Sequence, residues 1–252
     1  MTGKHTVAPL AAGCRGGREG LISSKVLTNE RSVSAVAGKL IGIVVAMACL
    51  TGTFSIRAVA APFEYPDVLR SYLYYSSDFD YEAAADDYLR CERPAVWRTV
   101  SNDEFKLAAA HTEAVRLMHA AAARGEADGT FTLLTSAHFG EYDPKAQRFS
   151  FRPFSVASFF SVVAPTQCGD GSLPRQIDLY FANPELVDGL PMLPDAAKDF
   201  LERRKSDRSV QVTLTVKVTG TRGDGQLDGQ IVKAEVVDQL QQAAGVLAAF
   251  GK

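Results

Sequence analysis

Residues 210–218 carry an apolar side chain at every second position, and this alternation constrains the fold more than any other feature of the chain. The apolar positions are Val210, Val212, Leu214, Val216 and Val218, and polar residues lie between them. A period of two places one row of side chains in a core and the other in water, which is typical of a strand in a half-buried antiparallel sheet. The run therefore predicts neighbouring strands on both sides and a layer over its apolar face.

Similar patterns predict five further strands. Residues 231–237 should pair antiparallel with 210–218, and the glycine-rich segment 220–229 is interpreted as the hairpin loop between them. Asp143-Pro144 supplies a turn between two earlier strands. The remaining predicted strands are marked by Phe131, Leu133, Ala137 and Phe139; by Phe149 and Phe151; by Phe159–Val163; and by Ile177, Leu179 and Phe181.

Helical periodicity dominates the part of the chain that precedes these strands. Residues 67–76 and 81–89 form two short helical segments, and a long helix is expected up to about Arg124-Gly125. Ser101 and Glu104 have the S-x-x-E spacing of a capping box, so that helix is predicted to begin at Ser101. A short helical turn capped by Asn183, a helix over 194–205 and a weak helix over 239–250 complete the expected elements.

Clustered helices followed by consecutive strands predict an α+β fold, with an N-terminal helical segment packed on a mostly antiparallel β-sheet. We expect a single domain over residues 61–252, with a helical part at 66–125, a sheet part at 130–238 and a C-terminal tail at 239–252. A chain of this length can bury a proper core. Residues 1–39 are rich in Gly, Ser, Ala and basic side chains, and we expect a disordered basic leader there.

An uncharged apolar run, Leu40–Ile56, separates that leader from the domain. Its 17 residues fall short of the roughly 20 that span a bilayer core as a helix. Basic residues precede the run and the small residues Ala58-Val59-Ala60 follow it, which is the layout of a secretory signal peptide cleaved after Ala60 or Ala61. Only Arg57 fits this template poorly. Two alternatives stay open: an uncleaved inner-membrane anchor with residues 61–252 outside the cytosol, and lipid attachment at Cys49.

Charge supports the same division and argues against nucleic acid as a partner. Residues 1–60 contain seven Lys and Arg against two Glu, a net charge of +5, so the remainder carries −7. A nucleic-acid site needs clustered cations, and the one basic group, Arg203-Arg204-Lys205 with Arg208, is interpreted as complementing a helix end. Contact with a membrane is expected only through residues 40–56, if they stay attached.

Two cysteines, Cys91 and Cys168, fall within the predicted exported part. In an oxidising compartment such a pair tends to form a disulfide. The sequence therefore predicts a bridge from the helical half to the loop before the strand at 177–181, with two free thiols as the alternative.

No cofactor or metal site is predicted. His111 and His119 lie eight residues apart on one helix, about 12 Å of rise, which is too far to share an ion; His111 is interpreted as a core histidine. The acids Asp78, Asp80, Glu82, Asp86 and Asp87 resemble the first half of a calcium loop but lack its glycine and its final acid, so we interpret them as favourable charges at a helix start.

These observations favour an exported bacterial-type envelope protein that binds another protein or a cell-surface component without catalysis. The tyrosines Tyr72, Tyr74 and Tyr75 are the predicted partner contacts, with packing onto the sheet as their alternative role. The catalytic residues, if any, stay unknown, because neither a nucleophile elbow nor a phosphate-binding loop is present, and Ser172 lacks the second glycine of such an elbow. The alternatives are an envelope hydrolase using His111 or His138, and a membrane-tethered assembly component.

Overall fold

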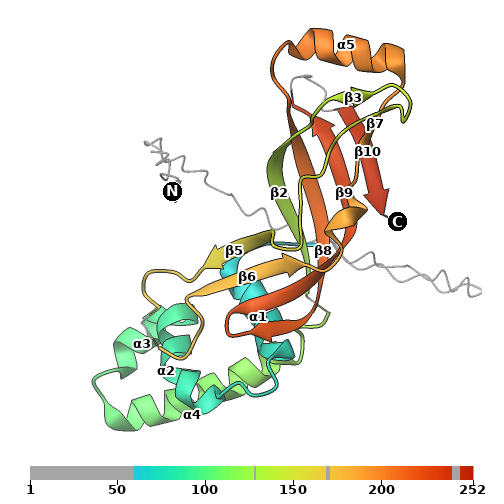
Figure 1. Ribbon diagram of the computed structural model, residues 1–252. Coiled ribbons are helices and arrows are strands. Elements are labelled where there is room, and N and C mark those ends of the chain that lie inside the picture. The colour runs from blue at the N-terminus through green and yellow to red at the C-terminus, as the bar shows by residue number, and fades with distance from the viewer. Residues whose placement is uncertain (1–59, 128, 169–170, 240–244, 252) are drawn as a thin grey trace, which may run out of the picture. The chain divides into compact units, whose positions relative to one another are not determined.

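The computed structural model describes residues 60–127, 129–168, 171–239 and 245–251 (Figure 1). The predicted leader, 1–39, and the apolar run, 40–56, lie outside these ranges. All the described residues fall within one compact unit of the chain. Helices come first and strands predominate afterwards, so the predicted α+β class is confirmed.

A mixed, mostly antiparallel sheet of seven strands organises the fold. Among the strands that the structure describes, only the pairs β1 with β2 and β6 with β9 are parallel. Strand β9 pairs with β8 on one side and with both β6 and β10 on the other. Along the sheet the strands are β1 (Ala61–Pro62), β2 (Thr130–His138), β8 (Ser209–Gly223), β9 (Gln226–Asp238), β6 (Gln176–Phe181) and β5 (Phe159–Val163), with β10 (Gly245–Gly251) beside β9.

The alternating residues 210–218 form a strand with one buried face and a neighbouring strand on each side, as predicted. The five apolar side chains of this run are at most 1% exposed, and Leu214 lies opposite Leu133 of β2 and Ala234 of β9. The prediction of a loop over 220–229 was wrong, because the ladder continues to the pair Gly223 and Gln226. A two-residue turn suffices there, since Gly225 adopts a φ of +65° that other residues rarely accept.

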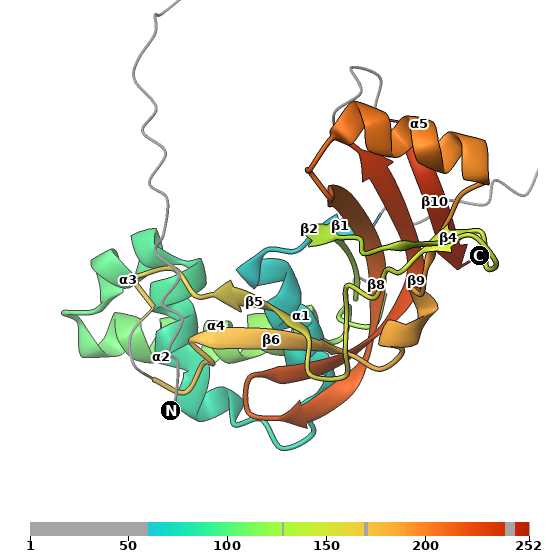
Figure 2. The same cartoon turned by 45° about the horizontal axis from the view of Figure 1, so that its top comes forward.

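A smaller, three-stranded sheet and one helix lie at the far end of β8 and β9 from the N-terminal helices (Figure 2). The sheet contains β3 (Tyr142–Asp143), β4 (Arg148–Phe149) and β7 (Leu190–Pro191), and α5 (Pro194–Arg204) follows it. Phe139 and Phe149 both pack on Phe200 of α5, with ring centroids 5.2 and 5.8 Å away. These rings attach α5 and the small sheet to the core.

A buried ion pair holds the end of α5 against β9. Arg204 donates to Asp238 at 2.6 Å, and both side chains are 1% exposed. Its guanidinium also lies 5.1 Å from the ring of Phe200. Arg204 had been interpreted only as a cation at a helix end, so its burial is a correction: an arginine enclosed in this way needs a carboxylate partner.

The 3-10 turn η1 (Pro184–Leu186) lies where Asn183 was expected to cap a helical turn. The Asn183 side chain makes no capping bond. Instead it bridges to β9, where it accepts from Ile231 N at 2.8 Å and donates to Ile231 O at 3.0 Å. Asparagine can satisfy a strand backbone as readily as a helix start, because its amide carries both donor and acceptor.

Four helices form the N-terminal half: α1 (Tyr65–Tyr75), α2 (Tyr81–Glu92), α3 (Pro94–Val100) and α4 (Glu104–Ala122). Helix α1 contacts β5, β6 and β8, and α2 packs on α3 and α4. The long helix starts later than predicted. Asp103 is its N-cap and accepts from Lys106 N, whereas Ser101 ends α3. A short helix that starts at Pro94 occupies the residues before that cap.

The predicted helix in the C-terminal tail was also wrong. Residues 245–251 form β10, antiparallel to β9, and Ala248 is buried there. The free edge of β9 accepts this segment, whose two terminal glycines disfavour a helix. Among the described residues, no helix has the length and apolar character needed to cross a membrane.

Candidate functional site

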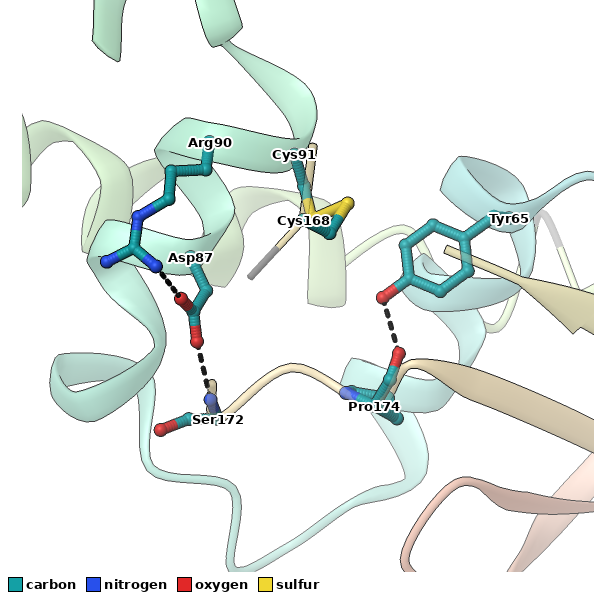
Figure 3. Close-up of a disulfide and its surroundings, with 7 residues drawn as sticks. All are labelled: Tyr65, Asp87, Arg90, Cys91, Cys168, Ser172 and Pro174. Atoms are coloured by element: carbon teal, nitrogen blue, oxygen red, sulfur yellow. Dashed lines mark hydrogen bonds and ion pairs between the residues drawn. A yellow bond between two sulfur atoms is a disulfide. The ribbon is translucent and has the colours of Figure 1, made fainter. Parts of the chain in front are cut away.

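The loop between β5 and β6 is attached to helix α2 by a disulfide. Cys91 of α2 is bonded to Cys168 of the loop, with their Cα atoms 4.5 Å apart and 77 positions between them in sequence (Figure 3). Both residues are at most 5% exposed. The bridge predicted from the sequence is therefore confirmed, including the two segments that it joins.

Asp87 fixes the same loop one helical turn before the disulfide. Its carboxylate accepts from the backbone N–H of Ser172 and from Arg90, whose Nη1 lies 2.9 Å away (Figure 3). Asp87 is only 5% exposed, so it is a buried anion with two donors and not a surface charge at a helix start. Glycine at 171 leaves room for this carboxylate, because a Cβ there would lie 1.4 Å from Asp87 Oδ2.

Tyr65 provides the third attachment of the loop. Its hydroxyl donates to the carbonyl oxygen of Pro174 at 2.7 Å. Burial raises the pKa of this phenol well above its usual value, and the nearby carboxylates of Glu92 and Asp87 raise it further. Tyr65 thus stays a neutral donor, and the loop is attached to the helices at Cys168, Ser172 and Pro174.

This braced loop forms one wall of an open cavity of about 580 Å³. The α1–α2 connection forms the second wall, and the tip of the β8–β9 hairpin forms the third. Most of the lining residues carry a hydroxyl or a charge, and the aromatic residues Tyr72 and Phe79 also line the cavity. The lining residues that matter here are Ser76, Ser77, Asp78, Phe79, Asp80, Ser172, Arg175, Thr221 and Asp224. Such a hollow offers many donors and acceptors to a polar ligand.

The three predicted contact tyrosines have different environments. Tyr72 is 6% exposed and packs edge-on against Phe79, with ring centroids 6.1 Å apart, so it belongs to the core. Tyr75 donates to the carbonyl of Val218 at 3.1 Å, which attaches α1 to the sheet. Tyr74 is 39% exposed and donates to Glu126 at 2.8 Å. Of these three tyrosines, Tyr74 is the most exposed to solvent.

The prediction of a core histidine at 111 was wrong. His111 is one-third exposed and lies between two acids of α2, with Nδ1 3.2 Å from Asp86 and Nε2 3.1 Å from Glu82. Partial burial disfavours its charged form, but the hydrogen bonds to the two carboxylates outweigh burial and raise the pKa of His111. Within the described ranges, no three His, Cys, Asp or Glu side chains are placed to hold a metal ion.

A second cavity, of about 480 Å³, surrounds His138 at the end of β2. Asp143, Ser150, Asp188, Arg148 and Arg152 also line it. Asp188 accepts from Arg152 at 2.7 Å and from Arg148 at 3.3 Å. Among the described residues, His138 has no hydrogen bond to Ser150 or to a carboxylate, so an imidazole and a hydroxyl line one cavity without being paired.

Comparison with known families gives one match. Residues 80–203, slightly under half of the 252, match a family model described as "Domain of unknown function (DUF4852)". That segment includes both cysteines of the disulfide and the whole lining of the His138 cavity. A search of curated proteins and a search of solved structures found no match to this chain.

Proposed function

We propose that this protein is exported to the periplasm or secreted, and that it acts there as a non-enzymatic binding module for a protein or a cell-envelope component. The single observation that carries the proposal is the disulfide between Cys91 and Cys168, which braces one wall of an open polar cavity. Structural disulfides persist in oxidising compartments and are rare in the cytosol.

The sequence before the domain supports the same location. The apolar run Leu40–Ile56 and the small residues Ala58-Val59-Ala60 have the layout of a signal peptide, and the first strand starts directly afterwards at Ala61. If the run stays attached instead, the same domain is tethered at the inner membrane with residues 61–252 outside the cytosol. Both forms place the cavity in the same compartment.

The composition of the cavity favours binding over catalysis. Three loops provide its hydroxyl and charged groups, and loops on a rigid scaffold are the usual carriers of recognition. Tyr74, on the exposed side of α1, is the tyrosine that we retain as a partner contact outside the cavity.

Site-specific photo-cross-linking in cells tests this proposal. A photo-activatable residue at Ser77, an exposed position in the cavity lining, should give a cross-linked product of defined mass. The same residue at Glu202, exposed on α5, serves as the control and should give none. Equal products at both positions, or none at either, would contradict a binding role for the cavity.

A second proposal, an envelope hydrolase, is favoured by one observation: His138, Ser150 and two aspartates surround a single cavity. Histidine next to a hydroxyl and a carboxylate is the composition that nucleophilic catalysis requires. Hydrolysis of p-nitrophenyl acetate or phosphate that disappears in both His138→Ala and Ser150→Ala would support this activity. The absence of turnover in the wild type, or its persistence in both variants, would reject it.

A further inference from the structure

We propose that strand β5 is a self-pairing edge, through which two copies of this protein join their sheets. Strand β5 (Phe159–Val163) ends the path of the large sheet, and among the described strands only β6 pairs with it. Figures 1 and 2 both show its outer side without a neighbouring strand.

The edge of β5 lacks the usual protection against strand pairing. Its sequence is Phe-Phe-Ser-Val-Val, without a charge, proline or glycine. Phe159 is 48% exposed and Val163 is 64% exposed. Natural proteins block exposed edges with lysine, proline or bulges, and an unblocked apolar edge is a template for another strand.

Strands β1 and β10, two other edge strands of the sheet, are protected. Strand β1 has two residues and one of them is Pro62. Strand β10 has an irregular register between Val246 and Ala248. Short strands, prolines and bulges all disfavour strand addition. The outer side of β2 beyond Thr132 also has no strand partner among the described strands, but β2 ends in the ionisable His138, whereas β5 is uncharged along its whole length.

The backbone of β5 has the right phase to accept a strand. Ala164 N–H donates to Arg175 O at 2.8 Å, so the polar backbone groups of Ala164 face β6. In an antiparallel pair these groups alternate in direction along the strand. It follows that the N–H and C=O groups of Phe159, Ser161 and Val163 face outward, away from β6.

A second copy of β5 satisfies these groups and matches the side chains. A two-fold axis at Ser161 would pair Ser161 with Ser161 of the second copy. Phe159 of each copy would then pair with Val163 of the other. Each of these three pairs would exchange both backbone hydrogen bonds. The two exposed apolar residues of the strand would then cover each other, an aromatic and β-branched pair of the kind that stabilises sheets.

Charge also favours self-pairing over pairing with a charged segment. No side chain of β5 is ionisable, so the two-fold contact places no like charges opposite each other. The same face of one copy meets itself, as closed two-fold dimers require. This inference concerns a surface other than the cavity and stands independently of the proposed binding role.

Sedimentation of the purified, oxidised protein over a range of concentrations tests the inference. The wild type should reach twice the monomer mass. Ser161→Lys places two ammonium groups opposite each other at the axis and should raise the dimer dissociation constant at least about tenfold. Ser136→Lys, at an exposed position on β2, is the matched control and should leave the dissociation constant unchanged.

The fold of the variants is checked separately by thermal melting. The side chain of Ser161 is exposed, although it donates to Asp178 at 2.5 Å. Val163→Lys is a second variant without that bond, and it should weaken the dimer in the same direction. A monomeric wild type, a monomer that instead takes up an unrelated extended peptide, or a dimer that neither variant weakens would overturn the inference.

Discussion

Removal of the disulfide is the most informative perturbation of this protein, because its expected effect follows from its sequence separation. The bridge joins residues 77 positions apart. In the chain-entropy model a closed loop of that length stabilises the native state by about 4.5 kcal/mol, and measured values are more often about 2–4 kcal/mol. We therefore expect the variant Cys91→Ala/Cys168→Ala to lose about 2–4 kcal/mol of unfolding free energy.

Urea unfolding of the oxidised wild type and of the double variant measures this loss. Alanine fits because both cysteines are buried, and because the backbone hydrogen bond from Cys168 N to Pro165 O does not depend on the side chain. For a domain of this size, each kcal/mol corresponds to a shift of about 2–4 °C in Tm, so thermal melting gives an independent value. A reductant should destabilise the wild type by a similar amount and should leave the double variant unchanged.

The structure also predicts where the loss appears first. The amide of Ser172 donates to Asp87, and this bond depends on the loop that Cys168 anchors. Hydrogen exchange at Ser172 should accelerate in the double variant before exchange in β8 does. If reductant changes the wild-type unfolding free energy by less than about 1 kcal/mol, and Ser172 exchanges no faster, the bracing role of the bridge is refuted.

Three further changes test other parts of the structure. Arg204→Ala should lower the unfolding free energy, measured in urea, by about 3–5 kcal/mol, because it leaves the buried carboxylate of Asp238 without this guanidinium. The control Arg203→Ala, on the exposed side of α5, should lower it by less than about 0.5 kcal/mol. Gly171→Ala should lower the unfolding free energy by about 1–3 kcal/mol, since the new Cβ collides with the carboxylate of Asp87. The control Gly220→Ala should leave it nearly unchanged, because a Cβ at position 220 would have no neighbouring atom within 4 Å. The raised pKa of His111 means that its ion pairs stabilise the fold fully below the ordinary pKa of 6.5, and that this stabilisation is lost as the pH rises through the higher folded pKa. A pH titration of stability that is unchanged by His111→Gln would contradict the last expectation.

Much of the fold could be predicted because buried positions recur at regular intervals in strands and helices, and apolar residues occupy them. The strands β2, β5, β6, β8 and β9 coincide with runs of alternating or continuous apolar residues. The disulfide could be predicted because only two cysteines fall in the domain. In both cases a local or compositional signal was sufficient.

Errors arose where neighbouring elements decide between two local possibilities. Ser101 and Asp103 are both good caps, and the presence of α3 selects Asp103. The tail at 245–251 has spacing compatible with a helix, but the open side of β9 takes it as a strand. Tertiary pairing overrides weak local preference in such cases.

The candidate site was mostly beyond sequence reasoning. Asp87 contacts Ser172, 85 positions away, and nothing in the local sequence distinguishes this acid from its neighbours. Gly171 was one usable signal, because glycine permits the backbone to approach another group closely. The cavity forms from three segments that only the fold brings together.

The most direct test of the central claim is the intact mass of the protein isolated from the exported fraction, with alkylation before and after reduction. An exported, disulfide-braced domain predicts a chain that starts at Ala61 or Pro62 and takes up alkylating groups at Cys91 and Cys168 only after reduction. A full-length chain recovered from the cytosol, with both thiols alkylated without reduction, would contradict the claim.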